Sequence, residues 1–315
     1  MKKIIVQLAF ILMLFSVTVS LMTREEYEEA KEHVQFEVLD YEKMVEIFKD
    51  MHPRDADVSR KTFLENKMFL ASEYEKQIKD QNFLALETNE NLPKEFWWVQ
   101  ARPECYSPVM NQKDCGACYI FSTVTVLQSR LCIQSRGRIN PILSPQDVLS
   151  CGTFHNKCDN GTLRGSWDYL EDVGTCSLQC KPYVSGDGAI PKCNNFCDDY
   201  HFEFKRWKAI KNSLKVVMGN EAIKREVYEN GPVSTQMETF EDLGIFKGGI
   251  YIHSWGKSTG GHGIIIEGWG YSEIHRKEYW ILRNSWGADW GDNGYFRVLF
   301  DSYEIDAGGA SSPLI

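Results

Sequence analysis

The chain has 315 residues, of which 43% are hydrophobic and 25% are charged. This composition is typical of one large or two ordinary globular domains, and it excludes disordered, collagen-like and fibrous proteins. The 35 Lys/Arg and 44 Asp/Glu residues give a net charge of -9, which argues against nucleic acid as a partner because phosphate binding relies on clustered basic side chains. The ten cysteines indicate an oxidising compartment, metal binding or thiol chemistry.

The first 20 residues are typical of a secretory signal peptide. Two lysines precede an apolar run over residues 4–19, and small residues suited to cleavage lie at its end. A transmembrane anchor would need about 20 apolar residues, and this run is shorter and contains Gln7. We therefore expect a signal peptide over residues 1–20, entry into the secretory pathway, and no membrane anchor in the mature form.

A composition change near residue 91 separates a leader from the rest of the chain. Residues 21–91 contain no glycine or cysteine and carry 10 Lys/Arg against 18 Asp/Glu. Thr23 and Glu26 form a capping-box pattern that predicts a helical run to about Asp50, and Pro53 separates it from a second amphipathic run over residues 59–79. The composition leaves open whether this leader is a small helical subdomain or a removable pro-segment covering a site.

After residue 92, helical patterns come first and strand patterns follow. Helices are predicted from Cys118 to a stop at Gly137, from Ser144 with a proline in the first turn, and over residues 221–230. Period-2 and short apolar patterns then predict strands over residues 232–238, 249–253, 263–267, 279–284 and 295–300. The expected α+β fold has a helical half over about 92–205 and a β half over about 206–315, with a site in the cleft between them.

The most informative stretch is Cys115-Gly116-Ala117-Cys118-Tyr119. Cys118 opens the first long helix, where the positive end of the helix dipole favours a nucleophilic thiolate. A C-G-[SA]-C-[WY] motif followed by His and Asn is a known cysteine-peptidase signature, and His262 and Asn284 follow in that order. A thioredoxin-like redox motif is the other interpretation of the two cysteines, but it needs a βαβ setting that the flanking sequence lacks.

The ordered set of motifs resembles the papain family of cysteine peptidases, and more closely its cathepsin B branch. The resemblance extends from residue 92 to about residue 297. Its motifs are Leu92-Pro93, Pro103-Glu104-Cys105, Arg130-Leu131-Cys132-Ile133, Leu143-Ser144-Pro145-Gln146-Asp147, Gly231-Pro232-Val233, Gly260-Gly261-His262, Asn284-Ser285-Trp286-Gly287 and Asp289-Trp290-Gly291-Asp292-Asn293-Gly294.

The resemblance implies a papain-like fold in two halves and a covalent mechanism. In it, the Cys118 thiolate attacks the peptide carbonyl, and the His262 imidazolium protonates the leaving amine. Asn284 would orient the imidazole, and the Gln112 side-chain amide with the Cys118 backbone N–H would form the oxyanion hole. Trp286 would shield the contact between His262 and Asn284 from water. The remaining substrate-binding positions are Asn160, Gly161 and Gly261.

The resemblance also implies a disulfide pattern, because nine cysteines remain besides the nucleophile. The implied pairs, which leave Cys176 over, are Cys105-Cys132, Cys115-Cys158, Cys151-Cys193 and Cys180-Cys197. Zinc is an alternative interpretation, with Cys151 and Cys158, or Cys193 and Cys197, as ligand pairs. Secretory export favours disulfides.

Four departures from the family bear on specificity. Tyr119 replaces the usual Trp, so we expect altered packing beside the nucleophile. Asn160 replaces a Gly of the cleft wall and begins an Asn160-Gly161-Thr162 glycosylation sequon. The segment 181–192 lacks the histidine pair of the loop that occludes the cathepsin B cleft, which implies an open cleft and endopeptidase action. Ala307 or Gly308 lies where an acidic residue would favour Arg, so we expect an apolar or aromatic preference.

These expectations describe a cysteine endopeptidase made as a secreted zymogen, destined for an acidic vesicle such as the lysosome or for the extracellular space. Residues 21–91 would be its inhibitory pro-segment, and acidification would release it because 18 carboxylates and two histidines change charge. Protein and peptide substrates and cystatin-type inhibitors are the expected partners, the protein is expected to be a monomer, and neither a metal nor an organic cofactor is expected. The alternatives are an inactive homologue that binds peptides, and an exopeptidase or transpeptidase with the same triad.

Overall fold

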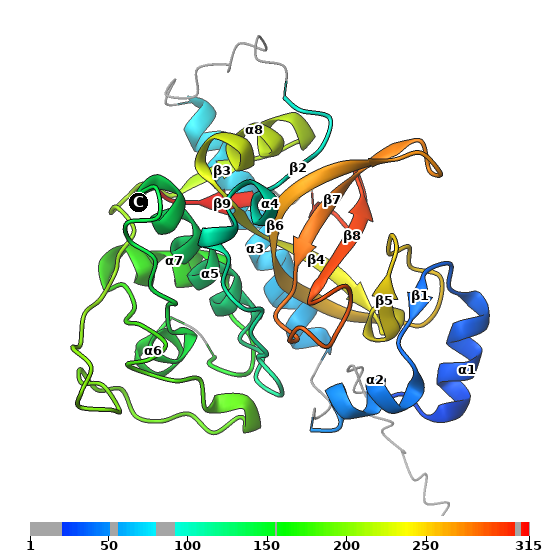
Figure 1. Ribbon diagram of the computed structural model, residues 1–315, viewed down its shortest axis with the longest axis horizontal. Helices are drawn as coiled ribbons and strands as arrows, with labels where there is room; N and C mark the ends of the chain where they lie inside the picture. Colours follow the sequence, from blue (N-terminus) through cyan, green and yellow to red (C-terminus); the bar gives the residue numbers. More distant parts are fainter. Residues whose placement is uncertain (1–20, 51–55, 80–91, 155, 306–309, 315) are drawn as a thin grey trace, which may run out of the picture.

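The computed structural model describes residues 21–50, 56–79, 92–154, 156–305 and 310–314. A mainly helical half and a mainly β half pack side by side, and the long helix α3 (Ala56–Lys79) lies between them (Figure 1). Helix α5 (Cys118–Gln134) packs against the sheet and joins the two halves. In the described part, no helix is both long and apolar enough to cross a membrane.

The helical half is built around α5, whose residues are buried from Cys118 to Cys132. Local caps explain where two neighbouring helices begin, because the side chain of Ser144 accepts from the Asp147 N–H and that of Thr162 from the Gly165 N–H. Helix α7 was not expected from the sequence. The other helical elements are α4 (Trp98–Ala101), η1 (Pro103–Cys105), α6 (Pro145–Cys151), α7 (Leu163–Asp172) and η2 (Ser185–Asp187).

The β half is an antiparallel sheet with the strand order β3-β9-β4-β6-β7-β8. Large aromatic side chains fill its core, among them Trp269, Trp280 and Trp290, all fully buried. Helix α8 (Asn220–Asn230) packs on this sheet, and β2 (Phe96–Trp97) pairs with β6. The strands and the short helix of this half are β3 (Lys215–Val217), β4 (Val233–Phe240), η3 (Glu241–Ile245), β6 (Ser258–Ser272), β7 (Lys277–Arg283), β8 (Tyr295–Leu299) and β9 (Ala310–Ser312).

Two of the expected elements are wrong, and the pairing of residues 37–38 with residues 246–248 explains both. The leader does not form one helix to Asp50, because α1 (Arg24–His33) and α2 (Tyr41–Phe48) are separated by β1 (Glu37–Val38). That strand pairs with β5 (Phe246–Gly248), and the expected strand at 249–253 contributes only an isolated bridge at Tyr251. Phe36 sits against Phe246 and Tyr251, so extended backbone in the leader buries apolar surface that a helix would not.

Four disulfides cross-link the helical half, with S–S distances of 2.04 to 2.07 Å. They join the same partners that the resemblance implies: Cys105-Cys132, Cys115-Cys158, Cys151-Cys193 and Cys180-Cys197. The zinc interpretation is therefore wrong, because all four of its sulfurs are in disulfides. Cys118 and Cys176 are not in disulfides, and both are buried.

Candidate active site

Cys118 is the first residue of α5 and lies 7% exposed at the end of the helix. Its N-cap residue, Ala117, makes no side-chain hydrogen bond to the first turn, so no capping side chain competes with the Cys118 sulfur for the positive end of the helix dipole. The sheet comes close to Cys118 at Gly263 of β6. A Cβ on Gly263 would lie 3.1 Å from main-chain atoms of Cys118 and Tyr119, so β6 can approach α5 closely only because residue 263 is glycine.

His262 lies on β6 directly before Gly263, and its ring is held by Asn284. The distance from His262 Nε2 to Asn284 Oδ1 is 2.7 Å, which leaves Nδ1 for the sulfur of Cys118. Burial lowers the pKa of His262, but the charge and hydrogen bond of Cys118 and the hydrogen bond to Asn284 outweigh it, so the pKa is raised above the usual imidazole value. The site therefore favours an imidazolium facing a thiolate.

Trp286 packs against the ring of His262 and does not line the cavity beside Cys118. Its ring centroid lies 5.0 Å from that of His262, and the side chain is 6% exposed. Trp290 packs edge-on against it at 4.9 Å. The hydrogen bond between His262 and Asn284 is thus kept from water, where it would be weaker.

Gln112 is held rigidly beside Ser285. Its backbone N–H donates to the Ser285 carbonyl at 2.8 Å, and the Ser285 hydroxyl donates to Gln112 Oε1. One hydrogen of the Gln112 amide is donated to the Cys115 carbonyl at 3.0 Å, so the second is available for an oxyanion. The sequence reasoning missed Ser285, although it lies inside the Asn284-Ser285-Trp286 motif.

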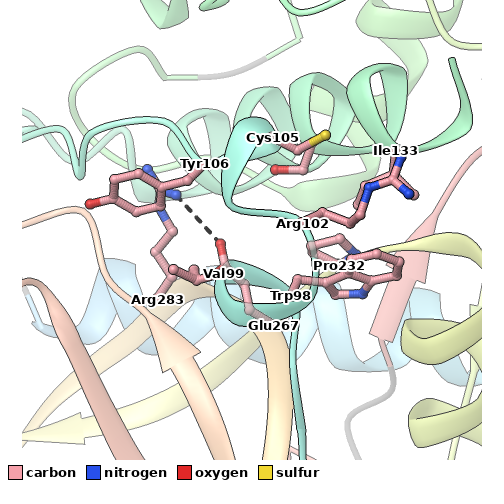
Figure 2. Close-up of a pocket in the computed structure, with 10 residues that line it drawn as sticks. Trp98, Val99, Arg102, Cys105, Tyr106, Ile133, Pro232, Glu267 and Arg283 are labelled. Atoms are coloured by element: carbon pink, nitrogen blue, oxygen red, sulfur yellow. Dashed lines mark hydrogen bonds and ion pairs between the residues drawn. The ribbon is translucent and has the colours of Figure 1, made fainter. Parts of the chain in front are cut away.

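A buried arginine ties together the two chain segments that carry these residues. Arg283, which precedes Asn284, donates to the carbonyls of Ser107 and Pro108 at 2.8 Å each. Figure 2 shows its ion pair with Glu267, 3.4 Å long. The hollow in that figure lies at the far end of α5, beside Ile133, about 20 Å along the helix from Cys118 at 1.5 Å per residue. It is thus separate from Cys118.

The cavity beside Cys118 is covered by α3. The Ser59 hydroxyl donates to the Gly261 carbonyl at 3.2 Å, and the Leu163 N–H donates to Asn66 Oδ1 at 3.1 Å. Three of the expected substrate-binding residues, Asn160, Gly161 and Gly261, line this cavity together with Cys118 and His262. The fourth, Trp286, does not line it. The full lining is Cys118, Tyr119, Asn160, Gly161, Leu163, Gln236, Gly261, His262 and Gly263, with Ser59, Thr62, Phe63 and Asn66 from α3.

Tyr119 follows Cys118 and packs against the cavity wall at Gly161. Its hydroxyl donates to the Lys157 carbonyl at 3.1 Å. A Cβ on Gly161 would lie only 2.4 Å from the Tyr119 ring, so the ring leaves no room for a side chain at residue 161. Asn160, the residue before, has a φ of +77°, which costs more for asparagine than for the glycine expected there.

Comparison with known proteins identifies the family. The sequence profile described as papain family cysteine protease matches residues 92–311. The chain belongs to this family. Cathepsin B-like CP3 of Giardia intestinalis is 34% identical over 211 residues, which cover 66% of this chain and 69% of the relative. Cathepsin B-like cysteine proteinase 5 of Caenorhabditis elegans is 31% identical over 255 residues, which cover 70% and 74%.

Solved structures agree with this assignment. ProCathepsin B S9 from Trypanosoma congolense superposes with a TM-score of 0.66 at 27% identity, covering 72% of this chain and 78% of that one. Digestive procathepsin L2 from Tenebrio molitor superposes with a TM-score of 0.59 at 24% identity, covering 74% and 71%, a likeness of fold alone. The protein is a cathepsin B-like cysteine protease with a papain-like fold.

Proposed function

We propose that the protein is a cysteine endopeptidase made as a secreted zymogen, with Cys118 as its nucleophile and His262 as its acid and base. One observation carries this proposal. Cys118, which is not in a disulfide, lies at an uncapped helix end beside His262, whose Nε2 is 2.7 Å from Asn284 Oδ1. This arrangement supplies a nucleophile, a proton carrier and a group that orients the carrier.

The steps follow from these positions. The Cys118 thiolate forms a bond to the peptide carbonyl carbon, and the negative oxygen is stabilised by the Gln112 amide and the Cys118 N–H. His262 gives its proton to the amine nitrogen, the C–N bond breaks, and a thioester remains. Neutral His262 then takes a proton from the attacking water, and thioester cleavage restores the thiolate and the imidazolium.

Endopeptidase action is supported by the chain between Cys180 and Cys193. It contains no histidine pair that could bind the carboxyl end of a substrate. Two disulfides, Cys151-Cys193 and Cys180-Cys197, hold it in the helical half. Long substrates could therefore extend through the cleft on both sides of the scissile bond.

We propose residues 1–20 as the signal peptide, which lie outside the described residues, and residues 21–91 as the pro-segment. In support, α3 covers the cavity beside Cys118, and Phe48 packs on Trp286. Among the described residues, ion pairs that join the leader to the rest are Lys43-Asp289, Lys67-Glu304 and Glu73-Arg164. Because the leader is strongly acidic, with 18 Asp/Glu against 10 Lys/Arg, we expect acidification to weaken its binding, and processing should then be faster at pH 5 than at pH 7.5. Equal rates would contradict acid release.

The function is tested by hydrolysis of a blocked dipeptidyl fluorogenic amide after removal of the leader. Wild type should be active, Cys118→Ala inactive, and an epoxide inhibitor of thiol proteases should abolish the wild-type signal. Cys176→Ala is the matched control, because this second cysteine outside the disulfides is fully buried and burial raises its pKa to about 12. An inactive wild type with a reduced Cys118 would instead favour a peptide-binding homologue.

A further inference from the structure

Gln236 is a polar side chain in the cavity that contains the catalytic pair. It lies on β4, where it pairs with Gly263 of β6, and its neighbour Met237 pairs with His262. The side chain is 3% exposed and lines the cavity together with Cys118 and His262. Nothing in the sequence indicated a role for it.

In the zymogen, the amide of Gln236 is satisfied by α3. Its Nε2 donates to the Phe63 carbonyl at 2.9 Å. The Phe63 side chain itself is 7% exposed and packs on Gly261, where an added Cβ would lie 2.5 Å from the Phe63 Cβ. The leader thus presents an apolar body and a carbonyl acceptor to the same cavity.

The remaining walls of the cavity are neutral. Besides Cys118 and His262, the mature part contributes Tyr119, Asn160, Leu163 and Gln236 with three glycines. Among the described lining residues there is no aspartate, glutamate, lysine or arginine. A charged substrate side chain would find no charged partner among these described residues and would lose its hydration.

We propose that Gln236 is a specificity-determining residue and that the protease prefers substrates with a neutral, hydrogen-bonding side chain in this cavity, glutamine before leucine. This rests on the proposed peptidase function. When the leader leaves, water can hydrate the Gln236 amide, and a substrate side chain then displaces that water. Leucine would leave the amide unpaired, whereas glutamine, of similar size, both accepts from it and donates to it. This differs from the apolar or aromatic preference expected from residues 307 and 308, which lie outside the described residues.

The test uses the processed enzyme and fluorogenic peptides in which Gln and Leu are exchanged at one position at a time, N-terminal to the scissile bond. The kcat/KM ratio of Gln to Leu should be about tenfold at one position in wild type. In Gln236→Met, which keeps the length and removes the amide, the ratio should invert. Glu238→Gln is the matched control, because Glu238 lies on the same strand but bonds Ser258, outside the cavity, and its ratio should equal that of wild type.

A wild-type ratio within twofold at every position would overturn the proposal, and this readout does not depend on any variant folding. A tenfold ratio that persists in Gln236→Met would also overturn it, because another residue would then select glutamine. Failure of the peptidase function looks different: neither wild type nor Cys118→Ala would hydrolyse any peptide of the series.

Discussion

Phe48 packs edge-on against Trp286 with 5.6 Å between the ring centroids, and the same tryptophan ring lies 5.0 Å from the His262 imidazole. The leader therefore contacts the candidate site at two places. Helix α3 covers the cavity beside Cys118, and Phe48 of α2 packs on Trp286, which lies beside His262. Phe48 is 1% exposed and belongs to the main core of the β half. Its packing makes the leader part of that core.

Phe48→Ala should weaken the leader's hold on the enzyme. Truncating a buried Phe costs about 3 kcal/mol or more, so the open form of the zymogen should rise on the order of a hundredfold. The measurement is the activity of unprocessed zymogen, made resistant to cleavage, at constant pH. Leu64→Ala is the control, because Leu64 lies on α3 but is 48% exposed, and it should leave the activity unchanged. Equal activities for the two variants would contradict the packing argument.

Ser285→Ala should lower kcat about tenfold with little change in KM, because a loosened donor stabilises the developing oxyanion less. The Ser285 hydroxyl is the contact that fixes Gln112 Oε1, and without it the amide can rotate. Ser285→Thr should restore most of the rate, since it returns the hydroxyl. A variant that changed KM alone would show that Ser285 acts on substrate binding instead.

The sequence predicted those parts of the fold whose signals are local. Ser144 caps α6 as its position before a proline indicates, and the capping box of Thr23 and Glu26 is present in α1. The two strands that the sequence did not predict, β1 and β5, are two and three residues long and exist because they pair with each other across some 200 positions. Strands that short carry almost no periodicity, so only their tertiary pairing fixes them.

The candidate site divides in the same way. Cys118, His262 and Asn284 stand in motifs whose order the sequence displays, and the structure brings His262 and Asn284 within 2.7 Å. Gln236 lies in a strand of alternating residues, where a polar side chain indicates a solvated face. Only the packing of α3 against β4 reveals that this face is buried in the zymogen.

Gly161→Ala should destabilise the protein, because its new Cβ would lie 2.4 to 2.9 Å from ring atoms of Tyr119. Overpacking of this kind costs about 1–3 kcal/mol, measurable as a lower free energy of unfolding in urea. Tyr119→Ala removes the ring, so adding Gly161→Ala to that variant should cost much less. Two additive effects would contradict a direct clash, since residues in contact are expected to couple.

Asn284→Ala should move the alkaline limb of the pH profile to lower pH. The hydrogen bond from Asn284 is one of the contacts that raise the pKa of His262 against the effect of burial. A raised pKa means that the imidazolium persists to higher pH and is lost as pH rises through that value. Removing the bond lowers the pKa, so the reactive ion pair should disappear earlier. The alkaline limb of kcat/KM for a fluorogenic peptide, followed across pH in the processed enzyme, measures this, because the imidazolium supplies the proton for the leaving amine. Asn140→Ala, which removes an exposed amide bonded to the Glu104 carbonyl, should keep the wild-type profile, and an unshifted limb in Asn284→Ala would show that Cys118 alone sustains the imidazolium.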